Sequence, residues 1–379
     1  MEYKEYELGE LLYYEQPTPY IVESTDYNDA YETPVLTAGK SFILGYTDEK
    51  EGIYDQLPVI IFDDFTTASQ YVNFKFKVKS SAMKILTPVT ELVLPKYIYY
   101  RIQIIQFDHS THKRYWIQQY SKIRVSIPPI PEQECIVARI EELFSQLDAG
   151  VETLKKTKAQ LAVYRQAVLK EAFEGDYPRK QLKEFSKAIS GFAFKSSRYS
   201  PDGNYVVVKI GNVKERHFDF SRDLTKTLEA DDSILEKYLL RRGDCLITLT
   251  GSRGKRDYGF VAMVGNQNNY LLNQRVAALR FDQSVALPEF FQYYLASPSY
   301  RDMFFGYETG NVGQGNVGIK ALLDPYVILP DIDMQKRIVE DVEDRLSVCD
   351  SIEQTVDTAL QQAEAMRQSI LKDAFEGRL

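Results

Sequence analysis

Cationic side chains gather in three places along the chain, and these are the residues best suited to bind a ligand. The first group alternates along a predicted strand, so its side chains share one face. The second lies beside two histidines, and the third lies in a loop whose glycines allow close backbone approach. The groups are Lys75, Lys77 and Lys79; His112, Lys113 and Arg114; and Ser252, Arg253, Lys255 and Arg256. Such side chains suit contacts to phosphate oxygens.

Other polar side chains near these groups are of the types that read the edges of nucleic-acid bases. Together with the three groups, they make up the predicted DNA-binding set. These additional residues are Lys40, Lys209, Asn212, Arg275, Gln314 and Asn316. Any one of these groups could equally be an ordinary solvated surface. The prediction therefore depends on the presence of three such groups, in two segments of the chain, 1–126 and 178–328, that resemble each other.

The sequence contains partial matches to catalytic motifs, and each match is incomplete. Asp324–Tyr326 matches part of the D-P-P-Y motif of adenine methyltransferases but lacks one proline, and no motif for the methyl donor is found. Gly313–Gly318 fits G-x-G-x-x-G, yet it follows a glycine-rich stretch where a dinucleotide site needs a strand. His109 and His112 lack further metal ligands. We therefore predict no catalytic residue, no metal and no enzyme activity.

The net charge is uneven along the 379 residues. The whole chain has 54 acidic and 46 basic side chains, a balance of −8 that by itself argues against a nucleic-acid binder. Residues 178–328, however, have a net charge of +5, whereas 1–126, 127–177 and 329–379 have −4, −3 and −6. The second large segment is therefore a basic module flanked by acidic ones.

An internal repeat divides the chain. Residues 127–175 align without gaps onto 329–377, with about 18 identities in 49 pairs. Each copy begins with prolines, ends before a glycine and carries apolar residues at heptad spacing, which predicts one helix of roughly 60 Å. The main seam positions are Ile140, Leu147, Leu154, Leu161 and Val168 in the first copy, and Val342, Val356 and Ile370 in the second.

Matched lengths and seams favour pairing of the two helices as an antiparallel coiled coil, although each helix could instead cap its own domain. Gly150 and Arg345 fall at seam positions, where we expect kinks or extra contacts.

The other segments, 1–126 and 178–328, are rich in short strand patterns with few helices and predict an α+β fold with a pseudo-two-fold repeat. Loose matches, such as Leu8–Leu11 with Leu182–Phe185, relate the two. Predicted strands are Val59–Phe62, Phe74–Val78, Tyr205–Ile210, Cys245–Leu249, Phe260–Val264 and Val276–Phe281, and predicted helices are Thr90–Ile105 and Pro288–Ala296.

The cellular compartment is indicated by two features. No apolar run approaches the roughly 18 residues of a membrane span. Cys135, Cys245 and Cys349 are far apart in sequence, so neither a disulfide framework nor a zinc site is expected. These features predict a cytoplasmic protein without membrane contact.

The order of domain, helix, domain, helix resembles the specificity subunit of type I restriction-modification systems. Proline-glutamine segments, Ile127–Gln133 and Ile328–Gln335, lead into the helices, and the glycine-rich run Gly310–Gly318 precedes the second helix, as in that family. The first domain departs from the pattern, with His109–Trp116 in place of such a run.

The resemblance implies that each domain reads one half of a bipartite double-stranded DNA site while the helices fix the gap. It also implies assembly with two methyltransferase subunits and, for restriction, with nuclease/translocase subunits. S-adenosylmethionine would then be bound by the methyltransferase, with no cofactor in this chain. The alternatives are a protein-interaction scaffold with two binding domains on a coiled coil, and a self-sufficient modification enzyme.

Overall fold

The computed structural model describes residues 3–39, 41–107, 114–227, 231–311 and 313–379. The chain forms two compact units. One contains Met1–Lys155 with Asp357–Leu379, and the other contains Lys156–Val356. Each unit therefore holds one β-rich domain with a part of both long helices.

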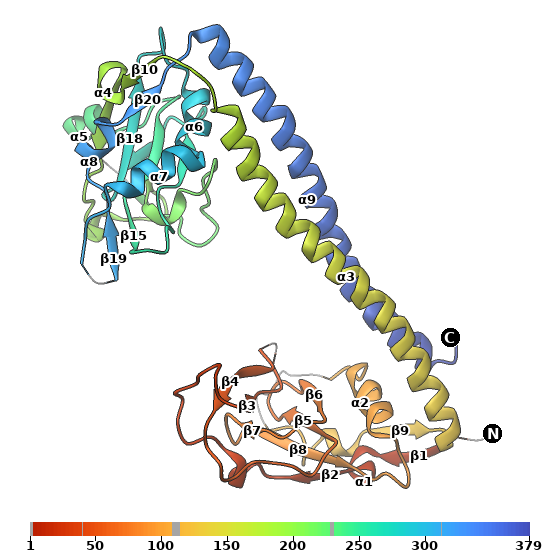
Figure 1. The fold of residues 1–379 in the computed structure, drawn as a ribbon. Helices are drawn as coiled ribbons and strands as arrows, with labels where there is room; N and C mark the ends of the chain where they lie inside the picture. The colour runs from red at the N-terminus through yellow and green to blue at the C-terminus, as the bar shows by residue number, and fades with distance from the viewer. Residues whose placement is uncertain (1–2, 40, 108–113, 228–230, 312) are drawn as a thin grey trace. The chain divides into compact units, whose positions relative to one another are not determined.

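The domain of the first unit is built from short, mostly antiparallel strands in three groups (Figure 1). One sheet has the order β2-β8-β5-β6 and a second the order β4-β3-β7, in which β3 and β7 are parallel, while β1 pairs with β9. The strands are β1 Lys4–Glu7, β2 Leu12–Glu15, β3 Thr33–Leu36, β4 Ile43–Thr47, β5 Val59–Asp63, β6 Ser69–Val72, β7 Lys77–Val78, β8 Met83–Pro88 and β9 Arg124–Ile127. The helices are α1 Leu8–Leu11 and α2 Pro95–Gln103.

The domain of the second unit repeats this topology. Its sheets have the orders β11-β18-β14-β16 and β13-β12-β17, with β12 and β17 parallel, and β10 pairs with β20. The strands are β10 Arg179–Gln181, β11 Ser186–Ser190, β12 Tyr205–Val208, β13 Lys226–Thr227, β14 Cys245–Thr248, β16 Val261–Met263, β17 Tyr270–Leu272, β18 Val276–Phe281 and β20 Tyr326–Ile328. The helices are α4 Leu182–Phe185, α5 Asp232–Tyr238, α6 Pro288–Ala296, α7 Pro298–Gly306 and α8 Ile319–Leu323, and a further ribbon pairs β15 Thr250–Ser252 with β19 Gln314–Asn316.

Local sequence explains the positions of the helices. Proline occupies the first position of both α2 and α6, where its fixed φ suits a helix and its missing N–H costs nothing. The predicted helix from Thr90 therefore begins only at Pro95, because Leu94 is held extended by the proline that follows it. The predictions for β18 and α6 are correct to the residue, whereas the strand predicted over Phe74–Val78 is reduced to β7.

Two long helices, α3 Ile130–Ala172 and α9 Ile332–Phe375, run side by side and antiparallel (Figure 1). In the second unit, an Nη atom of Arg165 lies 2.5 Å from an Oδ atom of Asp350. In the first unit, Arg367 forms an ion pair with Asp148. Because the repeat offset is 202, these are two copies of one interaction, and the predicted pairing of the helices is confirmed.

The seam of the helix pair is apolar on the residues that face each other. Ile140 and Phe144 pack with Leu371 and Ala374 in the first unit. Among the predicted seam residues, Ile140, Leu161, Val168, Val342 and Val356 are buried, while Leu147, Leu154 and Ile370 are half-buried. Arg345 makes the extra contact expected of a cation at the seam, with an Nη atom 2.8 Å from a carboxylate oxygen of Glu171. No helix of the described segments has the length and apolar character that crossing a bilayer requires.

The far end of each long helix packs on the short helix of a domain. In the second unit, the ring of Phe173, near the end of α3, lies 5.4 Å from that of Phe290 in α6. In the first unit, the ring of Phe375, at the end of α9, lies 5.3 Å from that of Tyr97 in α2. Phe173 and Phe375 are equivalent in the repeat, so both units are closed by the same aromatic contact.

A buried glutamine joins each long helix to a domain. Gln133 of α3 and Gln335 of α9 are both 0% exposed. The Gln133 Oε1 atom accepts from the backbone N–H of Leu94 at 2.8 Å, and its Nε2 donates to the carbonyls of Leu92 and Pro128 at 3.1 and 2.9 Å.

Gln335 repeats this pattern in the second unit. Its Oε1 accepts from Leu287 at 2.8 Å, and its Nε2 donates to Val285 and Pro330 at 2.8 and 2.7 Å. Each amide therefore satisfies three backbone groups at the point where the domain, its helix and the long helix meet.

The substitution Gln335→Leu tests this junction. It leaves two carbonyls and one amide without partners in a buried place, so the free energy of unfolding should fall by about 2–4 kcal/mol. Urea unfolding measures the loss, and amide hydrogen exchange should show lost protection at Leu287. Gln361→Leu, an exposed position on the same helix, serves as the control and should change stability by less than about 0.5 kcal/mol. Equal unfolding midpoints for the two variants would contradict this role of Gln335.

Candidate nucleic-acid interface

A hollow of about 370 Å³ lies on the second domain beside the β15–β19 ribbon. Four separate segments of the chain contribute to its wall, among them Lys214, Ser252, Arg275 and Gln314. Figure 1 shows the ribbon at the end of the domain opposite to the β10–β20 pair. The structure thus brings three residues of the predicted set, Ser252, Arg275 and Gln314, into one site.

Glycines allow the ribbon to lie against the domain. Gly251 and Gly315 face each other across the ribbon. A Cβ atom on Gly251 would lie 2.5 Å from the Oδ1 of Asp257, and one on Gly315 would collide with the carboxylate of Glu308. Close packing therefore requires Gly251 and Gly315, whereas a Cβ atom on Gly313 or Gly318 would meet no neighbour within 4 Å.

The basic loop after β15 places its cations at the outer end of the ribbon. The Arg253 guanidinium donates to the carbonyl of Gly310 at 2.9 Å, which ties the loop to the segment before β19. Arg256 lies 2.7 Å from the carboxylate of Asp302, with both side chains more than half exposed, so this pair is weak and can be exchanged for another anion. Lys255 is exposed.

Arg301 of α7 anchors the C-terminal side of this loop. Its guanidinium donates to the carbonyls of Arg256, Tyr258 and Gly259 at 2.8–3.1 Å. Burial lowers the pKa of Arg301 below its ordinary value, and the side chain nevertheless remains a cation at neutral pH. The loop therefore presents its own cations from a backbone that is anchored at several points.

The hollow also contains one carboxylate. The Oδ1 of Asp257 accepts from the backbone N–H of Ser252 at 2.7 Å. Hydrogen bonding from Ser252, first from its side chain and then from its backbone, holds the pKa of Asp257 below its usual value. The carboxylate therefore stays ionised, and it partly balances Lys214 and Arg275 on the same wall.

Two residues of the predicted set are structural. Lys77 is 3% exposed, with its Nζ 2.7 Å from the carboxylate of Glu49 and donating to the carbonyl of Glu51 at 2.7 Å. The prediction that three lysines share an exposed face is wrong for Lys77, because β7 spans only two residues and this side chain turns inward to meet the acidic loop.

Asn212 is 1% exposed, and its amide is fully engaged. Its Oδ1 accepts from the N–H of Lys209 at 2.9 Å, and its Nδ2 donates to the carbonyls of Asp219 and Asp223 at 3.1 and 2.7 Å. The prediction that Asn212 reads bases is wrong, because it closes the loop on which Lys214 stands.

The other predicted residues lie on the surface or outside the described segments. Lys209 lies 3.1 Å from Asp223 and above the ring of Tyr199, and Asn316 is an exposed residue of β19. In the first domain, Lys75 and Arg114 are exposed, and Lys79 lies 3.5 Å from the hydroxyl of Tyr27. Lys40, His112 and Lys113 lie outside the described residues.

Sequence reasoning missed Lys214, which stands on the wall of the hollow. It begins the charged run Lys214–His217 between two apolar residues, Val213 and Phe218, that pair as an antiparallel bridge. A charged tetrapeptide between two strand-like residues is a turn signal, and it was available in the sequence. Within the described residues, no group of three or more His, Cys, Asp or Glu side chains is placed to hold a metal ion.

Comparison with known proteins gives consistent matches. Residues 174–362 match the type I restriction modification DNA specificity domain. The specificity subunit of type I restriction enzyme EcoR124I/EcoR124II from Escherichia coli is 45% identical over 48% of this chain and 48% of its own length. The EcoKI specificity subunit of E. coli strain K12 is 29% identical over 69% of this chain and 58% of its own. The chain thus spans about half to three fifths of the length of these relatives.

Solved structures share the fold. A chain from a study of complex assembly and conformational transition of the type I R-M system aligns with a TM-score of 0.71 at 17% identity, covering 100% of this chain and 98% of its own. The HsdS subunit from Thermoanaerobacter tengcongensis aligns with a TM-score of 0.50 at 17% identity, covering 100% and 97%. The arrangement of two β-rich domains and two long helices therefore recurs in that group.

Replacing Asn212 tests whether it anchors the loop of the hollow. Asn212→Ala removes three hydrogen bonds from a buried place, so unfolding should become easier by about 2–4 kcal/mol. Chemical denaturation measures the change, with the exposed Asn268→Ala as the matched control. If Asn212→Ala unfolds at the same denaturant concentration as this control, the residue is not an anchor.

Proposed function

Because the chain belongs to the family of type I restriction-modification specificity subunits, we propose that it selects the DNA sequence on which such a system acts. The observation that carries this proposal is the hollow beside the β15–β19 ribbon. There, Lys214, Arg275 and Gln314 converge next to an anchored cationic loop. The chain supplies recognition, and the chemistry belongs to other subunits.

The loop and the hollow are suited to contact different parts of the DNA. Lys255, Arg253 and Arg256 are suited to phosphate oxygens, since they are cations at the outer end of the ribbon. Gln314 and Arg275 are of the types that form paired hydrogen bonds with adenine and guanine in the major groove. The ribbon is supported by close-packed glycines, so its side chains meet the DNA from a fixed backbone.

Each domain reads one half of a bipartite site. We assign the first reader to residues 1–126 and the second to 178–328, with the helical segments 127–177 and 329–379 holding them. Two readers on one support gain affinity through a high effective concentration, but only where both halves lie at the right gap. The duplicated topology of the domains supports two readers of the same kind with different side chains.

Partner subunits complete the activity. Two methyltransferase subunits dock on this chain, bind S-adenosylmethionine and flip the target adenine, and nuclease/translocase subunits join them for restriction. The helical segments have a combined excess of acidic residues, which suits protein contact better than contact with DNA. Three free cysteines, two of them buried, are consistent with a reducing cytoplasm.

The rival function is a scaffold that binds two proteins through the same domains. A scaffold would use the same coiled coil, but it would not require cations at the ribbon. Salt dependence separates the two, because each phosphate contact increases the magnitude of the slope of log affinity against log salt, called here the salt slope, by about 0.9.

The triple variant Arg253→Ala, Lys255→Ala and Arg256→Ala tests the loop. Affinity of the full chain with its methyltransferase for duplex DNA should fall about 10- to 100-fold at low salt, and the salt slope should fall by about two to three. Fluorescence anisotropy over a salt series measures both. The control triple, Arg179→Ala, Lys180→Ala and Lys183→Ala, removes the same charge at the opposite end of the domain and should bind as the parent does. Equal losses in both triples would mean that net charge, not this loop, binds DNA.

Lengthening the helix pair tests the spacing role. Seven residues inserted at facing positions of α3 and α9 keep the heptad seam and add about 10 Å. The preferred gap between half-sites should widen by about one to three base pairs, because base pairs are about 3.4 Å apart. Mapping of methylated adenines in a host that expresses the variant with its methyltransferase reads out the gap. An unchanged gap would show that the helices do not set it.

A further inference from the structure

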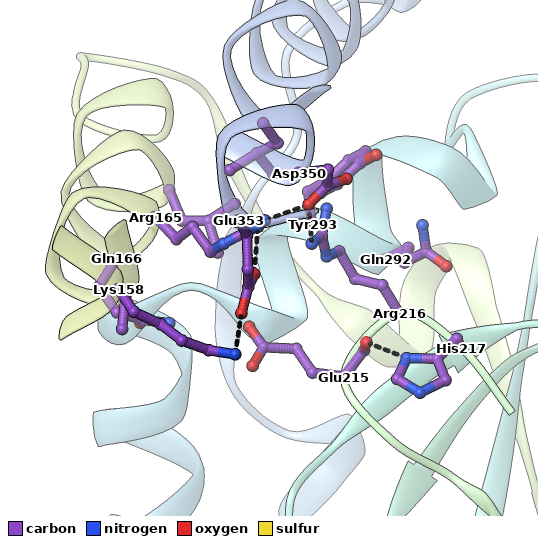
Figure 2. Close-up of a pocket in the computed structure, with 13 residues that line it drawn as sticks. Lys158, Arg165, Gln166, Glu215, Arg216, His217, Gln292, Tyr293, Asp350 and Glu353 are labelled. Carbon is purple, nitrogen blue, oxygen red and sulfur yellow. Dashed lines mark hydrogen bonds and ion pairs between the residues drawn. The ribbon is translucent and has the colours of Figure 1, made fainter. Parts of the chain in front are cut away.

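One tight turn connects the hollow to the part of the helix pair in the second unit. Val213 and Phe218 pair as a bridge, and the N–H of Lys214 donates to the carbonyl of His217 at 2.9 Å. Lys214 lines the hollow, whereas the next three residues, Glu215, Arg216 and His217, line a second cavity of about 650 Å³ against α3, α6 and α9. Figure 2 shows this second cavity with Arg216 directed toward Asp350 and Tyr293.

Arg216 is anchored through both its backbone and its side chain. Its N–H donates to the carbonyl of Val261 at 2.7 Å. Its guanidinium lies 3.9 Å from an Oδ atom of Asp350 in α9 and is also close to the hydroxyl of Tyr293 in α6. Burial raises the pKa of Tyr293, and the positive charge of Arg216 opposes that rise. The Tyr293 hydroxyl also donates to Glu343 at 3.4 Å.

Asp350 is itself held in place by the helix pair. Arg165 of α3 lies 2.5 Å from Asp350 and 2.8 Å from Glu353, and Lys158 lies 3.6 Å from Glu353 (Figure 2). The turn thus meets a network of charges that is shared by α3 and α9. A carboxylate fixed by one arginine offers a defined position to a second.

The backbone of Arg216 shows that the turn needs this anchor. Its φ is +67°. Glycine adopts this left-handed conformation freely, asparagine and aspartate adopt it at times, and other residues rarely do. A glycine would adopt this conformation without strain, so what the arginine contributes beyond the backbone is its guanidinium. In the structure, that contribution is the contact with Asp350 and Tyr293.

We propose that Arg216 is a positioning residue, which holds Lys214 in the hollow by tying the turn to the helix pair. This inference rests on the proposed function, because it assigns Lys214 a phosphate contact. The guanidinium of Arg216 meets the helices, whereas Lys214, two residues earlier, lines the hollow. Recognition by the second domain is thereby coupled to the geometry of the α3–α9 network.

Salt dependence distinguishes a residue that positions from one that touches DNA. The experiment uses the full chain with its methyltransferase subunits and a duplex carrying one site taken from mapped methylated adenines. Lys214→Ala should lower the salt slope by about one, because one phosphate contact is lost. Arg216→Gly keeps the backbone conformation and removes the guanidinium, so it should weaken binding about fivefold with the parent's salt slope.

Asp350→Asn tests the same contact from the other side. It should also weaken binding, and the double variant Arg216→Gly with Asp350→Asn should bind no more weakly than the weaker of the two single variants, since both break the Arg216–Asp350 contact. Arg216→Lys keeps the charge and should restore part of the affinity. Asp344→Asn, which removes an exposed carboxylate elsewhere on α9, is the control and should bind as the parent does.

The outcomes separate this inference from the function on which it rests. If the parent complex does not bind DNA, the proposed function fails. If the parent binds and neither Arg216→Gly nor Asp350→Asn changes affinity, only the positioning role is overturned. A salt slope lowered by about one in Arg216→Gly would show that Arg216 contacts phosphate itself. If circular dichroism shows that Arg216→Gly is unfolded, the affinities of Asp350→Asn and Asp344→Asn are compared instead. Equal affinities of these two variants would overturn the positioning role.

Discussion

A single buried glutamine at the start of each long helix is the interaction on which the architecture depends. Gln133 and Gln335 lie in equivalent places and satisfy three backbone groups each, one amide at the start of a short helix and two carbonyls on either side of the junction. A buried amide with every partner present tolerates little displacement, because any shift leaves polar groups without water or partner. The direction in which each domain leaves its helix is therefore fixed by a hydrogen-bond pattern and not by apolar packing alone.

Two further contacts hold each unit together beyond that junction. Aromatic rings at the ends of the long helices, Phe173 and Phe375, close onto the short helices α6 and α2, and the two copies of an Arg-Asp pair join α3 to α9. Each unit thus contains one domain, the first part of one long helix and the last part of the other. Only surfaces away from these shared contacts were free to diverge. In the second domain such a surface carries the β15–β19 ribbon with its basic loop, and the net charge of this domain is +5.

The repeated helices, their pairing and the α+β class could all be predicted, because they depend on periodicity and on self-similarity that one sequence contains. The binding surface could be predicted only in part. Ser252, Arg275 and Gln314 meet at one hollow as members of the predicted set, but Lys77 and Asn212 proved to be buried anchors. Residue type does not distinguish a lysine that meets a phosphate from one that neutralises Glu49, because that difference arises from contacts between segments distant in sequence. The turn that carries Lys214 has a local signal, but the place of Lys214 on the hollow depends on segments distant in sequence, those of Ser252, Arg275 and Gln314.

The central claim is that two different readers on one support recognise one DNA molecule together. The most direct measurement is the affinity of the full chain, with its methyltransferase subunits, for duplexes that carry both half-sites or only one of them. The account predicts that the duplex with both halves at the native gap binds at least about 100-fold more tightly than either single-half duplex, because the second contact becomes intramolecular. Equal affinity for the two-half and one-half duplexes would contradict it.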